Sequence, residues 1–189
     1  MPRRILGLDP GLVTTGYAVL EVREDGPAVL EAGVIRSGDG REPADMAPRL
    51  KALYDGLCEV MDQWTPTLMC VEQLFAHYDH PRTAILMAHA RGCYLLAGAQ
   101  RGIDVQSYAA TRVKKTVTGS GRATKEQMQM AVMRELGLVK LPEPHDVADA
   151  LGIALCAYYL TANAIVSGSR NVRFQGVNRA MLGQASDDE

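Results

Sequence analysis

Four acidic residues stand at positions where carboxylates are rarely tolerated without a partner. Asp9 ends an apolar segment immediately before a Pro-Gly pair, and Glu72 ends the apolar run TLMCVE. Asp146 and Asp149 are three residues apart, so a helix would present them on one face. Acids at the ends of apolar segments are poorly solvated and, brought together, repel one another unless a cation lies between them. An all-oxygen ligand set indicates Mg²⁺ or Mn²⁺ rather than zinc.

Each acid also has a plainer interpretation. Asp9, before Pro-Gly, could be a turn former. Asp146 and Asp149 could be acids favoured by the helix dipole at an N-terminus. Glu72 is harder to explain in this way, because the run before it demands burial and no basic residue lies within four positions of it. A shared metal site is therefore a hypothesis about the four residues together.

Hydrophobic patterning predicts the elements that would position these acids. Apolar runs and turn signals predict strands over 4–9, 16–22, 27–36, 67–72 and 103–107. Helical spacing predicts helices over 46–64, 82–100, 108–117, 124–136 and 146–164. Three strands followed by alternating helices and strands predict the α/β class, with a five-stranded mixed sheet flanked by helices. This is the order of a ribonuclease H-like fold, in which the ends of the first and fourth strands are commonly adjacent.

The composition is that of a globular protein with one domain. The chain has 189 residues, of which 47% are hydrophobic and 22% are charged. We expect residues 1–165 to form a single domain and the Gly-, Ser-, Asn- and Arg-rich residues 166–189 to form a flexible C-terminal tail. No apolar run approaches the ~20 residues that span a bilayer, and the N-terminus lacks a signal-peptide pattern. We therefore expect a cytoplasmic protein with no membrane contact.

The distribution of charge is more informative than its sum, which is −2. Between residues 101 and 125 the chain carries six basic residues and one acid, a net charge of +5. Such a run is often only a solvated face, but it is also the electrostatic pattern of a nucleic-acid contact. The basic residues are Arg101, Arg112, Lys114, Lys115, Arg122 and Lys125.

Four sequence motifs together resemble the RuvC family of Holliday junction resolvases. GLDPG followed by TTGYAVL resembles the first motif of that family, VEQLF the second and HDVADALGIA the third. Between the second and third, SYAATRVKKTVTGSGRATKEQ is similar to the basic DNA-binding segment. The matching stretches follow one another in the family's order from Ile5 to about Tyr158. The first motif alone is weak, because Hsp70-like and sugar-kinase ATPases open similarly.

The resemblance implies metal-dependent hydrolysis of a DNA phosphodiester, leaving 5′-phosphate and 3′-hydroxyl ends. It places the catalytic, metal-binding acids at Asp9, Glu72, Asp146 and Asp149. The implied cofactor is Mg²⁺ or Mn²⁺, with two ions in each active site. Asp146 fills a position at which family members carry Asp or His. The preceding His145 is then either a group near the metal or an exposed residue.

The resemblance also implies a set of DNA-contacting residues. Phe75 would wedge or stack against bases near the junction, an interaction worth ~1–3 kcal/mol per base; its plainer interpretation is a core residue that closes the strand. Lys114 and Lys125 match basic positions that face the DNA backbone. Lys115 and Arg122 depart from the family pattern and could extend the DNA footprint or merely aid solubility. The expected contacts are Phe75, Tyr78, Arg82, Lys114, Lys115, Arg122 and Lys125.

The expected partners follow from the expected substrate. Resolution of four-way junction DNA needs two symmetric nicks, which implies a two-fold homodimer. The predicted helix over 82–100, with Ala88, Ala90, Gly92 and Ala97, is the candidate dimer surface, unless it is an ordinary core helix. The resemblance further implies cooperation with the RuvA–RuvB branch-migration complex.

Three other functions share parts of this pattern. A ribonuclease H-like nuclease acting on RNA, such as an rRNA-processing enzyme, would share the acids but should lack Phe75 and the basic segment. An actin-like ATPase opens with a similar first motif but needs two such domains, for which 189 residues is too short. A catalytically silent junction-binding protein would have lost an acid, and all four are present.

Overall fold

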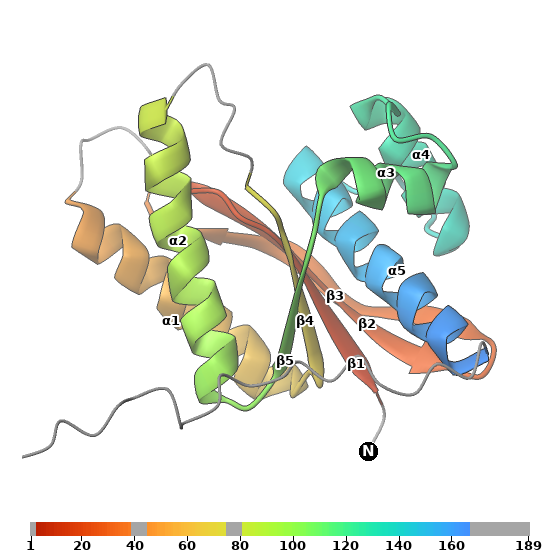
Figure 1. Ribbon diagram of the computed structural model, residues 1–189, viewed down its shortest axis with the longest axis horizontal. Helices are drawn as coiled ribbons and strands as arrows, with labels where there is room; N and C mark the ends of the chain where they lie inside the picture. The colour runs from red at the N-terminus through yellow and green to blue at the C-terminus, as the bar shows by residue number, and fades with distance from the viewer. Residues whose placement is uncertain (1–2, 39–44, 75–80, 167–189) are drawn as a thin grey trace, which may run out of the picture.

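A five-stranded mixed sheet forms the centre of the molecule (Figure 1). The computed structural model describes residues 3–38, 45–74 and 81–166. The strands are β1 Arg4–Asp9, β2 Thr14–Arg23, β3 Gly26–Arg36, β4 Leu68–Glu72 and β5 Asp104–Tyr108, in the spatial order β3-β2-β1-β4-β5. The first three pair antiparallel, whereas β4 pairs parallel with both β1 and β5. The predicted α/β class and mixed sheet are confirmed.

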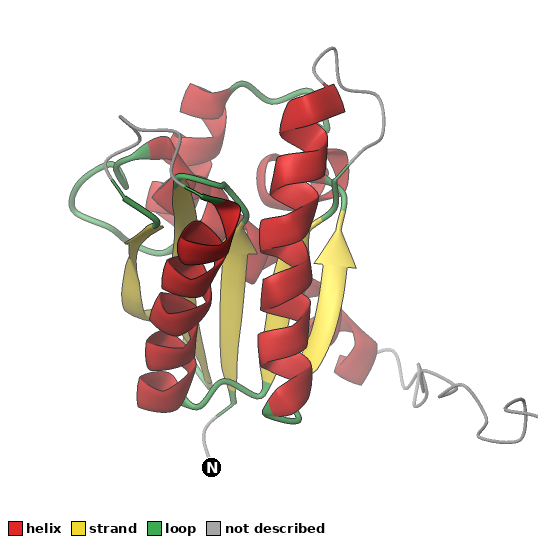
Figure 2. Cartoon of the chain, turned by 90° about the vertical axis from the view of Figure 1, so that its left-hand side faces the viewer, coloured by secondary structure: helices red, strands yellow, loops and turns green. Residues whose placement is uncertain are grey.

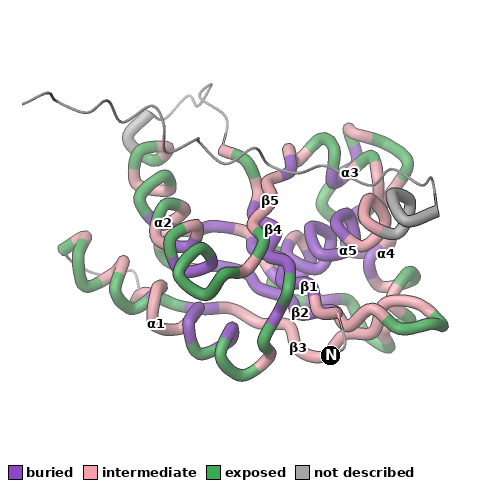
Figure 3. The backbone as a smooth tube through the Cα atoms, turned by 60° about the horizontal axis from the view of Figure 1, so that its bottom comes forward, coloured by how far each residue is buried: buried purple, intermediate pink, exposed green. Residues whose placement is uncertain are grey.

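Helices cover both faces of the sheet. On one face lie α1 Met46–Trp64 and α2 Pro81–Gln100, which Figure 2 shows in front of the strands. On the other face lie α3 Ala110–Thr118, α4 Lys125–Glu135 and α5 His145–Val166. Two apolar clusters result, one between the sheet and α1 and α2, and one between the sheet and α5. Helix α5 is buried along most of its described length (Figure 3).

The predicted elements agree with the structure to within two residues at each end, but one residue belongs to a different type of element than predicted. Tyr108 is the last residue of β5 rather than the first residue of a helix. It pairs with Glu72 of β4 and its ring is buried in the α5 cluster, so sheet pairing overrides the local helical pattern. The predicted capping box is present, because the Thr124 side chain accepts from the Gln127 backbone N–H and the Gln127 side chain accepts from that of Thr124.

The predicted tail, 166–189, lies outside the described residues except for Val166, the last residue of α5. The four cysteines are free thiols; Cys58, Cys70 and Cys156 are buried and Cys93 is half-buried. Within the described ranges, none of the helices combines the length and the apolar character that a membrane span requires.

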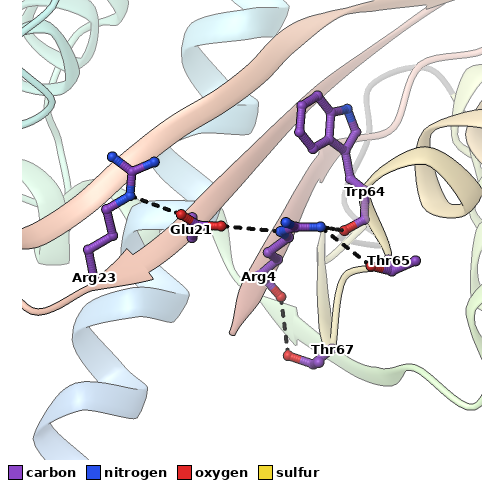
Figure 4. A network of polar contacts seen from close by, with 6 residues as sticks. All are labelled: Arg4, Glu21, Arg23, Trp64, Thr65 and Thr67. Carbon is purple, nitrogen blue, oxygen red and sulfur yellow. Dashed lines mark hydrogen bonds and ion pairs between the residues drawn. The ribbon is translucent and has the colours of Figure 1, made fainter. Parts of the chain in front are cut away.

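A polar network fixes the end of the sheet at which β1 and β4 begin (Figure 4). Arg4 Nη1 donates to the Trp64 carbonyl at 2.7 Å, and Arg4 Nε forms an ion pair with Glu21 at 3.4 Å. The Glu21 carboxylate also accepts from Arg23 at 2.9 Å, and Thr67 donates to the Arg4 carbonyl. Every charge in this network has a partner. The opposite end of the same strands carries Asp9 and Glu72, which are described next.

Candidate active site

Asp9 and Glu72 end adjacent parallel strands and face the same side of the sheet. The pairing of β1 with β4 aligns Leu8 with Val71, one residue before each acid. Side chains alternate between the two faces along a strand. Leu8 and Val71 belong to the cluster under α1 and α2, so the acids that follow them continue the series that faces α5. The predicted adjacency of these two strand ends is therefore present.

Two glycines bring the start of α5 against these strand ends. Gly16 is the partner of Asp9 across β1 and β2, and a Cβ built on it would lie 2.0 Å from the Asp146 carbonyl oxygen. A Cβ on Gly7, two residues before Asp9, would lie 2.3 Å from the Ala150 carbonyl oxygen. No larger residue fits at either position without a shift of the helix. The absence of two side chains thus lets the α5 acids approach Asp9.

The pKa values of three of the acids are raised, first by burial and then by the charges of neighbouring acids, in agreement with this close approach. Burial raises the pKa of Asp9 to about 8, and the negative charges of Glu72, Asp149 and Asp146 add to the rise. Burial raises the pKa of Glu72 to about 6, with a further contribution from Asp149. The pKa of Asp149 is also raised, first by burial, with Asp146 acting in the same direction. The structure therefore brings the four predicted acids together.

Two lysines from the basic segment act in the opposite direction. The charge of Lys125, the first residue of α4, lowers the pKa of both Asp9 and Asp149. The charge of Lys114, on α3, lowers the pKa of Glu72 and of Asp149. Lys125 is exposed and Lys114 is half-buried. Helices α3 and α4 thus place positive charge next to the acids, where a phosphate would approach.

The residue types fit a divalent cation, although the side chains are not in ligand geometry. Among the residues that the structure describes, no group of three or more His, Cys, Asp or Glu side chains forms a cluster that could hold a metal ion. Burial is the largest cause of the raised pKa values of Asp9, Glu72 and Asp149, and the charges of neighbouring acids add to it. Carboxylate oxygens are the ligands that Mg²⁺ and Mn²⁺ prefer. A cation here would offset both the cost of burying the carboxylates and the repulsion between them.

The remaining predicted residues differ in what the structure says of them. Phe75 and Tyr78 lie outside the described residues. Arg82 belongs to α2, but its side chain lies outside the description. Lys115 and Arg122 are exposed on the basic segment. His145 is the exposed first residue of α5, and its charge lowers the pKa of Asp149.

Two glycines that allow the close approach of α5 were not among the predicted site residues. Gly7 and Gly16 both lie inside strand patterns, and a glycine within a strand often marks close approach of another backbone. That signal was present in GLDPG and in TTGYAVL. It becomes specific only when the register places Gly16 opposite Asp9.

A mixed sheet of this order, with acids gathered at the ends of its first and fourth strands and the start of its last helix, is that of the ribonuclease H-like nucleases. The family model for the crossover junction endodeoxyribonuclease RuvC matches residues 5–157. The RuvC of Rhodopirellula baltica is 53% identical over 163 residues, covering 85% of this chain and 89% of that protein. The chain belongs to the RuvC family, whose members are metal-dependent nucleases.

Solved structures of the family agree with this membership. The Thermus thermophilus RuvC structure is 30% identical, with a TM-score of 0.74 over 85% of this chain and 96% of that chain. The same organism's RuvC in complex with Holliday junction substrate is 28% identical, with a TM-score of 0.73 over 84% of this chain and 96% of that chain. The predicted ribonuclease H-like fold is confirmed by these likenesses.

Proposed function

We propose that this chain resolves four-way DNA junctions by metal-dependent hydrolysis, with Asp9, Glu72, Asp146 and Asp149 as the metal-binding acids. The observation that carries the proposal is geometric: Asp9 and Glu72 end adjacent parallel strands, and the start of α5, with Asp146 and Asp149, lies against them. Membership of the RuvC family supports the reaction class, and the junction complex of the Thermus thermophilus relative supports the substrate.

The cofactor is proposed to be Mg²⁺ or Mn²⁺, with two ions per site. Bound divalent ions activate water and stabilise the leaving oxygen in phosphodiester hydrolysis, which here would leave 5′-phosphate and 3′-hydroxyl ends. The four carboxylates would hold the ions once Asp9, with a pKa of about 8, has lost its proton. Lys114 and Lys125 would stabilise phosphate charge beside the acids.

DNA binding is proposed to extend from the acids along α3 and α4. Lys114, Lys115, Arg122 and Lys125 follow one another on this segment and would neutralise backbone phosphates. The other proposed contacts, Phe75, Tyr78 and Arg82, come from the chain that follows β4, the strand ending at Glu72. An aromatic side chain there would stack on bases at the junction point.

The chain is proposed to act as a homodimer through the outer face of α2. Ile85 is 59% exposed and Leu96 is 55% exposed, so this face presents two large apolar side chains to solvent. His89 and Gly92 are exposed between them, at spacings of four, three and four residues that make one stripe. Of the four small residues expected on this surface, Ala88 and Gly92 are exposed. Ala90 and Ala97 are completely buried in the protomer's own core, so that part of the predicted surface is wrong.

Cooperation with the RuvA–RuvB complex and action in the cytoplasm are proposed from the family resemblance. The domain boundaries, with a nuclease domain over 1–165 and a flexible tail over 166–189, are proposed from the sequence pattern. None of these three proposals is needed for the cleavage reaction itself.

The test compares an end-labelled four-way junction with a matched linear duplex and a matched RNA. Wild type and Asp146→Asn are incubated with Mg²⁺, Mn²⁺ or EDTA. We expect paired nicks at symmetric positions in the junction alone, absent in EDTA and in the variant. Cutting of the RNA or of the linear duplex would contradict the substrate, and junction binding without cleavage in either metal would contradict the mechanism.

A further inference from the structure

Helix α2 presents two polar side chains to the sheet from its otherwise apolar inner side. Arg91 and Tyr94 are three residues apart and therefore lie on one face of the helix. Tyr94 is completely buried and Arg91 is half-buried. A buried hydroxyl or guanidinium group is costly unless it finds partners. Both side chains have hydrogen-bond partners at the end of the sheet where the acids lie.

Arg91 joins the ends of β4 and β5. Its Nε donates to the carbonyl oxygen of Glu72 at 3.1 Å, and its Nη2 donates to Ser107 Oγ at 2.6 Å. The guanidinium is planar and holds its donors in a fixed geometry, so two such bonds constrain direction as well as distance. The backbone of Glu72 is thereby held from the face opposite its side chain.

Tyr94 holds the turn that follows Asp9. Its hydroxyl lies 2.5 Å from Thr15 Oγ1, and both residues are completely buried. Thr15 Oγ1 donates to the Gly11 carbonyl at 2.9 Å and accepts from the Gly11 N–H at 3.3 Å. Because the threonine hydroxyl has a single proton, already given to Gly11, Tyr94 is the donor in the remaining bond. Gly11 is two residues beyond Asp9. Helix α2 therefore supports the backbone next to Asp9 through Tyr94 and Thr15, and it contacts the backbone of Glu72 through Arg91.

We propose that Arg91 and Tyr94 are positioning residues that set the separation of the Asp9 and Glu72 carboxylates. They act through the backbone, since their bonds are made on the α2 side of the sheet and the acids face α5. Strands β1 and β4 are neighbours, so two contacts from one rigid helix fix their ends relative to each other. This inference rests on the proposed assignment of the two acids to the metal site.

The test measures Mn²⁺ binding directly by calorimetry, beside thermal unfolding and junction binding in EDTA. Tyr94→Phe removes one hydroxyl, and Arg91→Gln removes the paired donors while Arg91→Lys keeps the charge. Supporting shells of a metal site typically contribute ~10-fold or more to its affinity. We expect Tyr94→Phe and Arg91→Gln to weaken Mn²⁺ binding to about that extent, with partial rescue in Arg91→Lys and unchanged junction binding in EDTA.

Matched controls lie where the other end of α2 meets α1. Tyr54 donates to Gln100 at 2.6 Å, and Arg101 pairs with Asp62 at 2.8 Å. Tyr54→Phe and Arg101→Gln therefore remove bonds of the same kind far from the acids and should leave Mn²⁺ binding unchanged. Equal losses in test and control variants, or no loss in either, would overturn the inference. If Arg91→Gln does not fold, Tyr94→Phe alone decides.

One further variant separates this inference from the proposed function. Asp9→Asn is titrated with Mn²⁺ in parallel. If it loses Mn²⁺ binding while Tyr94→Phe and Arg91→Gln keep it, the positioning role fails and the site assignment stands. If Asp9→Asn binds Mn²⁺ as wild type does, the site assignment itself fails.

Discussion

Replacing Gly16 by alanine should separate the acids of α5 from Asp9 without removing any of them. The new Cβ would lie 2.0 Å from the Asp146 carbonyl oxygen and 2.5 Å from its carbonyl carbon. Ordinary contact begins at 3.4 Å, so the start of α5 must retreat by about 1.4 Å. A misplacement of ~1 Å at a reacting centre can cost ~100-fold in rate. Overpacking of this kind typically costs ~1–3 kcal/mol of stability.

The assay is single-turnover cleavage of a labelled four-way junction at saturating enzyme, with junction binding in EDTA and thermal unfolding measured beside it. Gly33→Ala is the matched control, because its Cβ would lie 3.0–3.2 Å from the Tyr17 ring, a side chain that can give way. We expect Gly16→Ala to cleave ~100-fold more slowly than Gly33→Ala while binding the junction equally. Equal cleavage rates in the two folded variants would refute the argument that the close approach of α5 positions the site.

Three further predictions concern charge. In metal-free protein the pKa of Asp9, about 8, is raised above its unfolded value, so its titration should lower the free energy of unfolding as pH rises from about 4 to about 8, by at most ~1.4 kcal/mol per pH unit. Chemical denaturation of Asp9→Asn should show a shallower slope than wild type, because the raised pKa values of Glu72 and Asp149 still contribute a slope of the same sign. Lys125→Ala should move the acid limb of the cleavage pH profile to higher pH, because Lys125 lowers the pKa of Asp9, and an unmoved limb would contradict this. Lys115→Ala and Arg122→Ala should each reduce the salt slope of junction binding by ~0.9 if they contact phosphates, and an unchanged slope assigns them to solubility.

The sequence predicted the sheet well because its strands are read from short-range patterns. Continuous apolar runs next to Pro or Gly identified β1 and β4. Each run ends at an acid, so the same pattern placed Asp9 and Glu72 at strand ends. Tyr108 was assigned wrongly because its place is decided by pairing with β4 and burial against α5. These are long-range contacts, which local propensity does not contain.

The supporting parts of the site were harder to predict than the acids themselves. An acid after an apolar run is conspicuous by type, whereas Gly7 and Gly16 act through the space that they leave empty. Likewise Arg91 is one of two arginines in a largely apolar helix, and nothing local to it indicates that it binds the carbonyl of Glu72. Both effects depend on which elements the fold brings together.

The two ends of the sheet show how the fold tolerates its acids. At one end Arg4, Glu21 and Arg23 satisfy one another's charges. At the other, burial and neighbouring negative charges raise the pKa of Asp9 and of Glu72, and the charges of Lys125 and Lys114 offset this only partly. Two apolar clusters and the hydrogen bonds made by α2 hold these strand ends in place. The carboxylates therefore stay close together although they repel one another. The positions of the acids are therefore set by the backbone, so neutralising one acid should leave the fold intact and lower the pKa of the acids that its charge had raised.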